Sequence, residues 1–381
     1  MENQELVEVR DRLGRSRRWV VKIGSALATN NGLGLNLTRM RNWASQIADL
    51  EGPERQIVVV ASGSVAEGAS RLGWKQPPHV LNKLQAAAAV GQIGLARTWA
   101  EVFDEVGCKT AQILLTHDDL ADRQRYLNAR TTLLTLLDLS VVPVVNENDT
   151  VVTTELSLGD NDTLAGLVSN LIEADLLVIL TDQQGLMTAD PRVIQNAKLI
   201  HEALVDSNEL DSYAKGGGEW GRGGMVTKLR AARLASRSAT STVIVSGVEE
   251  NVLVKISQGD RIGTLLYSKR EKLASRKQWL GGIVLAKGRI TVDRGACSAL
   301  KEKGRSLLAV GIKNVVGEFE RGDVVILVDD IGDDVARGIV NYSSKECVSI
   351  KGRTSHEIES VLGFSREPEV IHRDNLLIEE F

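Results

Sequence analysis

The stretch VVPVVNENDT, residues 141–150, leads into SLGDNDTLAG, residues 157–166, and this combination decides the fold. Its first five residues are apolar with little alternation, which is typical of a strand covered by protein on both faces. Polar residues follow, and a helical pattern begins near residue 162. A buried strand that leads through a polar turn into a helix is the repeating unit of parallel α/β sheets.

Five further apolar runs predict strands of the same kind: WVVKI (19–23), IVVVA (57–61), AQILL (111–115), LLVIL (176–180) and TVIV (242–245). Helical patterns lie between them, at residues 38–50, 81–106, 122–139, 162–173 and 226–238. This alternation predicts an α/β fold in which helices sandwich a mainly parallel sheet. Ligands of such sheets bind beyond the carboxyl ends of the strands. Separately, residues 118–133 fit one charged amphipathic helix, with a solvated face or a subunit contact.

The pattern changes near residue 269, which predicts a second domain. SKREKLASRKQW, residues 268–279, holds five basic residues and one acidic residue, as expected of a linker or an exposed connecting helix. Short strand patterns separated by Gly and Asp turns follow. We therefore predict a first domain at 1–268, a linker at 269–280, a small β-rich domain at 281–364 and a C-terminal tail at 365–381 that is surface-bound or loose.

The amino-acid composition argues against several classes of protein. Of the 381 residues, 43% are apolar and 25% charged, and 46 Lys and Arg against 50 Asp and Glu give a net charge of −4. This balance argues against a protein that coats nucleic acid or a membrane surface. Three scattered cysteines fit a reducing compartment. No signal-peptide core and no run of roughly 18 apolar residues occurs, so we expect a cytoplasmic protein without a membrane span.

Four loops at strand ends carry residues suited to binding. Lys22 precedes Gly24, a pattern that fits an anion site or a surface lysine beside a turn. Ser62 lies among small residues that open a helix, where free amides bind anions or small side chains cap. The third loop offers seven polar side chains that suit an ammonium group, a lysine or magnesium: Asn146, Glu147, Asn148, Asp149, Asp160, Asn161 and Asp162.

The fourth region runs from Thr181 and Asp182 to a glycine-rich loop and a helix that carries Lys228. Gly216, Gly218 and Gly221 form a G-x-G-x-x-G, but no strand closely precedes it, which argues against a dinucleotide fingerprint. A P-loop motif is absent, and the five histidines show no ligand spacing for zinc. A flexible anion-binding loop remains.

Taken together, these segments resemble the glutamate 5-kinase (γ-glutamyl kinase) branch of the amino acid kinase family. The similar stretches are VVKIGSALAT, VVVASGSVAEG, LLTHDDLADRQRYLNARTTL, VVPVVNENDTV, LGDNDTLA, LTDQQGLMTADPR and GGMVTKLRAA. GRITVDRGA, GIKNVVGEFERGDVV and ARGIVNYSS resemble the PUA domain that follows the kinase in many bacterial members. The resemblance spans about residues 18–373. It implies transfer of the γ-phosphoryl group of ATP to the side-chain carboxylate of L-glutamate, the first step of proline biosynthesis. It also implies Mg²⁺, feedback inhibition by proline and a homo-oligomer.

The resemblance assigns roles to individual residues. Lys22 and Lys228 fall on the family's phosphate-binding lysines, and Asp162, with Asp160 as second choice, positions them. Ser62, Asp149 and Asn161 fall on its glutamate-binding positions, with Asn146 close by. Its nucleotide site includes Lys22, Thr181, Asp182 and the segment Arg222, Gly223, Gly224, Met225, Val226, Thr227 and Lys228. Arg222 stands where a small hydroxyl residue is expected, and both a phosphate contact and a solvent-facing side chain fit it. The direct ligands of Mg²⁺ stay unknown.

Two other interpretations are open. A sister amino acid kinase would act on aspartate, acetylglutamate or carbamate. An RNA-binding protein would act through the small domain, but residues 281–381 hold 14 Lys and Arg against 17 Asp and Glu, whereas RNA-binding surfaces are usually basic.

Overall fold

The computed structural model divides the chain into two compact units, Met1–Arg270 and Glu271–Phe381. The structure describes residues 9–378, except for 11–12, 31, 33, 53, 77, 79, 152–159, 190–193, 195, 215–223, 269–285, 302–303 and 365–366. The predicted linker, 269–280, and the predicted start of the small domain at 281 lie outside the described residues. Within the described part, none of the helices has the length and apolar character needed to cross a membrane.

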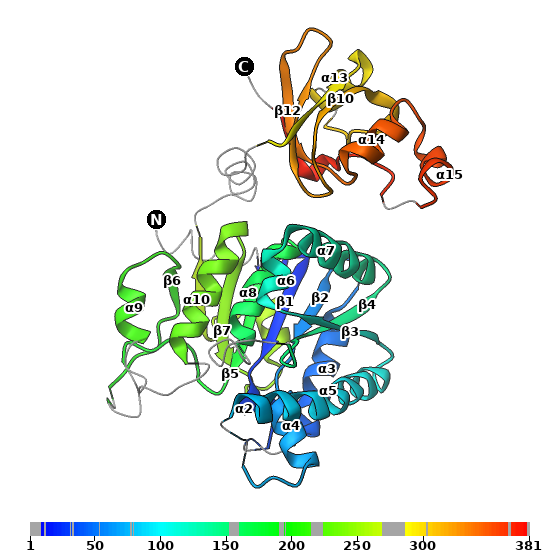
Figure 1. The fold of residues 1–381 in the computed structure, drawn as a ribbon. Coiled ribbons are helices and arrows are strands. Elements are labelled where there is room, and N and C mark those ends of the chain that lie inside the picture. The colour runs from blue at the N-terminus through cyan, green and yellow to red at the C-terminus, as the bar shows by residue number, and fades with distance from the viewer. Residues whose placement is uncertain are drawn as a thin grey trace. The chain divides into compact units, whose positions relative to one another are not determined.

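The first unit is built on an eight-stranded sheet (Figure 1). The spatial order is β3-β4-β2-β1-β5-β7-β8-β6, and β7 and β8 form its only antiparallel pair among the described strands. In chain order the strands are β1 (Arg18–Ile23), β2 (Gln56–Val60), β3 (Lys109–Leu115), β4 (Val141–Glu147), β5 (Leu176–Thr181), β6 (Glu202–Leu204), β7 (Ser241–Ser246) and β8 (Thr264–Tyr267).

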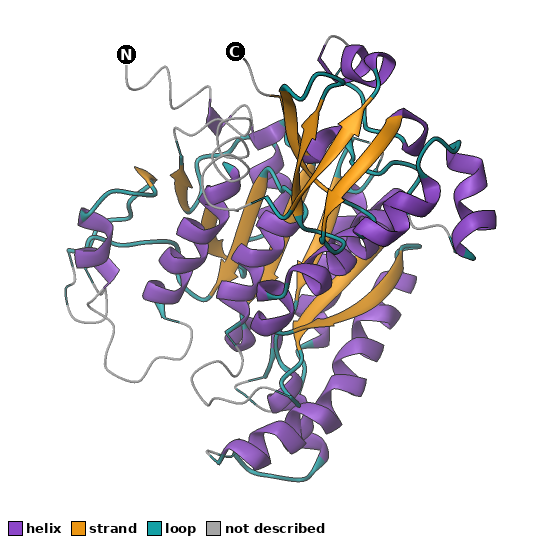
Figure 2. Ribbon diagram, turned by 45° about the horizontal axis from the view of Figure 1, so that its top comes forward, coloured by secondary structure: helices purple, strands orange, loops and turns teal. Residues whose placement is uncertain are grey.

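Helices cover both faces of this sheet (Figure 2). The described helices of this unit are α2 (Ser25–Ala28), α3 (Leu37–Leu50), α4 (Ser64–Arg71), α5 (Leu81–Asp104), α6 (His117–Ala121), α7 (Arg123–Asp138), α8 (Asn161–Leu171), α9 (Glu209–Ala214), α10 (Met225–Ala235) and α11 (Val252–Ser257). Trp19 and Val21 of β1 pack in one apolar core with α3, α5 and α11. Val20, between them, packs in the other with α7, α8, α9 and α10. This use of both strand faces explains the unbroken apolar runs in the sequence.

The structure confirms the α/β fold class and all six predicted strands of the first unit, each within two residues. One interpretation was wrong: β3 is an edge strand, and its residues Lys109, Gln112 and Leu114 are exposed rather than covered on both faces. Residues 118–133 also do not form one helix, because α6 ends and α7 begins at Asp122. The Asp122 side chain accepts the backbone N–H of Arg125, so it caps the second helix and separates the two.

The second unit holds a five-stranded, mainly antiparallel sheet in the order β10-β9-β11-β12-β13. The strands are β9 (Gly288–Val292), β10 (Ile312–Gly317), β11 (Val324–Val328), β12 (Asp334–Ile339) and β13 (Leu376–Ile378), and the helices are α13 (Arg294–Lys301), α14 (Ser344–Ile350) and α15 (Ile358–Leu362). A small β-rich domain was therefore correctly predicted. The tail predicted from residue 365 is neither loose nor confined to the surface, because Val370 and Ile371 are buried in this unit's core and β13 pairs with β12.

Candidate active site

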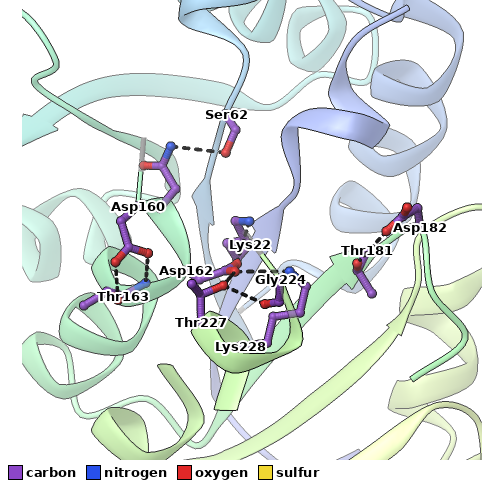
Figure 3. A network of polar contacts seen from close by, with 11 residues as sticks. Lys22, Ser62, Asp160, Asp162, Thr163, Thr181, Asp182, Gly224, Thr227 and Lys228 are labelled. Atoms are coloured by element: carbon purple, nitrogen blue, oxygen red, sulfur yellow. Dashed lines mark hydrogen bonds and ion pairs between the residues drawn. The ribbon is translucent and has the colours of Figure 1, made fainter. Parts of the chain in front are cut away.

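Lys22, Asp162 and Lys228 meet beyond the middle of the sheet, although they come from three separate elements (Figure 3). Lys22 lies near the end of β1, Asp162 in the first turn of α8, and Lys228 in the first turn of α10. The Lys22 Nζ is 2.6 Å from Asp162 Oδ1, and the Lys228 Nζ is 3.1 Å from Asp162 Oδ2. All three side chains are buried. One carboxylate thus holds two lysine side chains in a fixed relation.

The electrostatics of this cluster favour an anion. Burial raises the pKa of the Asp162 carboxyl, but Lys22 and Lys228 outweigh that effect and lower the pKa to about 2. Burial also lowers the pKa of Lys228 below its ordinary value, against the opposing effect of Asp162. Two lysines share one carboxylate, so the cluster has an excess of positive charge in a place of low dielectric. Phosphate oxygens would balance that charge.

Thr227 ties the start of α10 to the same carboxylate. Its hydroxyl donates to Asp162 Oδ2 at 2.6 Å and lies 2.8 Å from the Gly224 carbonyl oxygen (Figure 3). Gly224 is the N-cap of α10, and Met225 and Val226 begin the helix. The first N–H groups of a helix lack partners within it and can bind an anion. Thr181 is the last residue of β5 and Asp182 follows it, and their side chains are joined by a 3.1 Å hydrogen bond. Arg222 and Gly223 lie outside the described residues.

A second polar group surrounds Asn161, the first residue of α8. Its Oδ1 accepts the backbone N–H of Glu147 at 3.3 Å, and its Nδ2 donates to Ser62 Oγ at 3.1 Å. Ser62 precedes Gly63, whose φ of 119° lies in the left-handed region and therefore favours glycine. These contacts link the loop after β2 to the last residue of β4 and to the first residue of α8.

Asp149 and Asn146 complete this side of the site. Ser64 donates its hydroxyl hydrogen to Asp149 Oδ2 at 3.0 Å, and both side chains are buried. Asn146 Nδ2 donates to Gln92 Oε1 of α5 at 2.7 Å, while the buried Asn146 Oδ1 has no hydrogen-bond partner among the residues that the structure describes. A cavity of about 240 Å³ adjoins them, lined by Ala88, Ala89, Gln92, Ile93, Gln112, Leu114, Glu147, Asn148, Asp149 and Thr150. The acceptor side of the site therefore offers polar groups next to an open space.

The family model described as "Amino acid kinase family" matches residues 17–246, which include every described residue of the cluster. The chain belongs to the amino acid kinase family. A PUA domain model matches residues 288–362 of the second unit.

Curated relatives extend this family assignment along nearly the whole chain. "Glutamate 5-kinase" of Thioalkalivibrio sulfidiphilus is 55% identical over 374 residues, which are 98% of this chain and 100% of that protein. "Glutamate 5-kinase" of Stutzerimonas stutzeri is 56% identical over 371 residues, or 97% of this chain and 100% of that protein. Among solved structures, a UMP kinase from Bacillus anthracis covers 67% of this chain and 97% of its own, at 17% identity and a TM-score of 0.48.

The structure brings the predicted residues of this amino acid kinase into two adjoining groups, and their individual roles stay predictions. Asp162 rather than Asp160 contacts the lysines; Asp160 instead caps α8 by accepting from Thr163. Sequence reasoning missed Gln92 and His117. It named Glu147 as a polar side chain suited to binding, but not its contact with His117, in which the side chains lie 3.3 Å apart. No local sequence pattern predicts these contacts, because the partners lie 30 or more positions apart in the sequence.

Proposed function

We propose that the protein transfers the γ-phosphoryl group of ATP to the side-chain carboxylate of L-glutamate, as a glutamate 5-kinase. The observation that carries this proposal is that the Asp162 carboxylate forms ion pairs with both Lys22 and Lys228. Such a pair of cations neutralises charge on a transferring phosphoryl group, and phosphoryl transfer depends mainly on positioning and electrostatics. The choice of glutamate is supported by relatives of that name at 55% and 56% identity.

In this proposal the cluster of Lys22, Asp162 and Lys228 binds the phosphates, and the polar group around Asn161 binds glutamate. Lys22 and Lys228 hold phosphate oxygens, Asp162 positions both lysines, and the start of α10 with Thr181 and Asp182 receives the nucleotide. Ser62, Asn161 and Asn146 orient the glutamate, and the carboxylate of Asp149 binds its α-ammonium group. A general base is unnecessary because a carboxylate acceptor with a pKa near 4 is already ionised at neutral pH.

Mg²⁺ enters as part of the substrate MgATP. Among the described residues, no group of three or more His, Cys, Asp or Glu side chains could hold an ion. Both oxygens of Asp162 already contact lysine or threonine donors. Such a donor set suits an ion carried chiefly by phosphate oxygens, which is how Mg²⁺ commonly binds in kinases.

Three further properties belong to the same proposal. Proline inhibits the enzyme at or near the glutamate site, because it also carries an ammonium-type nitrogen and a carboxylate. The enzyme works as a homo-oligomer. It acts in the cytoplasm as the first enzyme of proline biosynthesis.

A hydroxamate assay with ATP, Mg²⁺ and L-glutamate tests the proposal, because hydroxylamine traps an acyl phosphate. We expect glutamate-dependent product that requires Mg²⁺, with aspartate a poor substitute. Comparable rates on aspartate, acetylglutamate or carbamate would instead favour a sister enzyme. Salt-dependent binding of labelled RNA without kinase activity would favour the RNA-binding alternative.

A further inference from the structure

The side chains of His117 and Glu147 are in contact beside the acceptor side of the site, and the contact is an ion pair when the His117 ring is protonated. His117 begins α6 just after β3, and Glu147 is the last residue of the neighbouring strand β4. His117 Nδ1 lies 3.3 Å from Glu147 Oε1, and the side chains are 30% and 1% exposed. The strand register explains the meeting, since Leu115 of β3 lies directly opposite Glu147. The pair is thus fixed by the sheet.

Glu147 connects this pair to groups that the proposed function assigns to glutamate. Its backbone N–H donates to Asn161 Oδ1, which leaves the Asn161 amide to face Ser62. Glu147 also lies in the lining of the cavity, together with Asn148 and Asp149. A movement of Glu147 at the end of β4 would therefore also displace Asn161, through this hydrogen bond, and Asp149, which lies two residues further along the chain.

A nearly fully buried carboxylate is costly unless cations or hydrogen bonds compensate it. An imidazolium at His117 supplies a positive charge that a neutral imidazole lacks. The charged groups that act on His117 from neighbouring elements are Glu147 of β4, Asp160 before α8 and Arg230 of α10. Of these, both carboxylates favour the protonated ring and Arg230 opposes it.

We propose that His117 is a positioning residue whose positive charge holds Glu147, and through it Asn161 and Asp149, in the arrangement that binds glutamate. This inference rests on the proposed function. The acceptor is itself an anion, so the negative charge of Glu147 disfavours its binding more when the neighbouring His117 ring is neutral than when it is charged. Affinity for glutamate then falls when His117 loses its proton.

The direction of the pH effect follows from the geometry. The hydrogen bond to Glu147 raises the pKa of His117 above its ordinary value, against the opposing effect of burial. Below that pKa the ring is charged and the glutamate KM is low. As the pH rises through it, the KM rises, while kcat at saturating glutamate changes little because the lysine cluster is not involved.

The test measures the glutamate KM and kcat from pH 6 to 8.5 in three proteins at saturating MgATP. In the wild type we expect the KM to rise roughly fivefold, an effect typical of a partly exposed ion pair. His117→Arg keeps a charge at every pH, so its KM stays low and flat. His117→Gln has none, so its KM stays high and flat. Ionisation of glutamate itself is common to all three and cancels in the comparison.

His372→Gln is the matched control, because His372 Nε2 pairs with Glu369 Oε1 at 3.6 Å in the second unit. It should keep the wild-type profile. A His117→Gln profile that coincides with the wild type, in a protein that unfolds at the same temperature, would overturn the inference and leave the proposed function intact. Absence of any γ-glutamyl product in the wild type would instead refute the proposed function.

The contact between His117 and Glu147 can also be tested without an activity assay, by an NMR titration of the histidine rings. Only five histidines contribute to the ring signals in an NMR titration, and the His117 signal is the one missing from His117→Gln. Glu147→Gln should lower the pKa of His117 toward its ordinary value. An unchanged His117 titration in that variant would contradict the ion pair itself.

Discussion

Asp162 holds two lysine side chains in place because each of its two carboxylate oxygens contacts one of them. Oδ1 contacts Lys22, and Oδ2 contacts Lys228 and the Thr227 hydroxyl. A lysine chain has four rotatable bonds, and a buried partner restricts the ammonium group to one position. This preorganisation matters most when charge shifts during phosphoryl transfer.

Lys22→Ala and Lys228→Ala should therefore each lower kcat more than tenfold, because in the proposed mechanism each removes a charge that stabilises the transition state by about 1.4 kcal/mol or more. Steady-state kinetics with glutamate and MgATP measures this. Lys198→Ala, at an exposed lysine of the same unit, is the control and should keep wild-type kcat. Wild-type kcat in both folded lysine variants would disprove the two-lysine mechanism.

Asp149 permits a test of substrate binding at a position remote from the reacting carboxylate. Asp149→Asn keeps the shape but loses the proposed charge-assisted bond to the ammonium group, a kind of bond typically worth about 1.5–3 kcal/mol. The glutamate KM should rise about tenfold or more, and the ATP KM should stay within about twofold. Undiminished proline inhibition in this variant would separate the proline site from the glutamate site, whereas an unchanged glutamate KM would refute the assignment of Asp149.

At the scale of elements, α5 supports the acceptor side by lying directly against α4. A Cβ atom on Gly91 would lie 1.9 Å from the Ser64 carbonyl oxygen and 2.4 Å from the Gly68 nitrogen, so only glycine permits this approach. The next residue, Gln92, accepts the Asn146 amide. One stretch of α5 therefore sets the position of both Ser64 and Asn146.

Gly91→Ala should push α4 away and displace Ser64, which holds Asp149. We expect a glutamate KM raised roughly tenfold, since small misplacements of binding groups are costly, together with a lower unfolding temperature. Gly94→Ala is the matched control, because the three atoms nearest to its Cβ would belong to the side-chain ends of Arg71 and Glu67 rather than to the backbone of α4. Equal kinetics for the two variants would show that the close contact does not position the site.

The elements also show what the sequence could and could not predict. Strands such as β1 and β5 were found because burial on both faces leaves a continuous apolar run. The short strand β6 has no such run, since its three residues are at most partly buried. The antiparallel direction of β8 depends on pairing with β7, which local sequence does not record. Likewise, Asp162 was recognised by its motif, whereas His117 and Glu147 meet only through the register of β3 and β4.

At the scale of the whole molecule, the two units have separate cores. Two clusters of buried apolar residues cover the faces of the first sheet, and a third, from Ile290 to Ile371, belongs to the second unit. Every described residue of the candidate site, from Lys22 to Lys228, belongs to the first unit. The chemistry and the fold that supports it are therefore contained in one part of the chain.

A chain ended after Ser268 should consequently fold and phosphorylate glutamate. It keeps all eight strands of the first sheet, of which the last, β8, ends at Tyr267. We expect cooperative thermal unfolding, as for a domain with its own core. The KM for glutamate and for ATP should stay within about twofold of the full chain, because no binding group is removed. Circular dichroism establishes folding and the hydroxamate assay establishes activity, with truncated Lys228→Ala as the inactive control. A truncated protein that unfolds cooperatively yet makes no γ-glutamyl phosphate would mean that the second unit completes the active site, since folding alone would then be insufficient for catalysis.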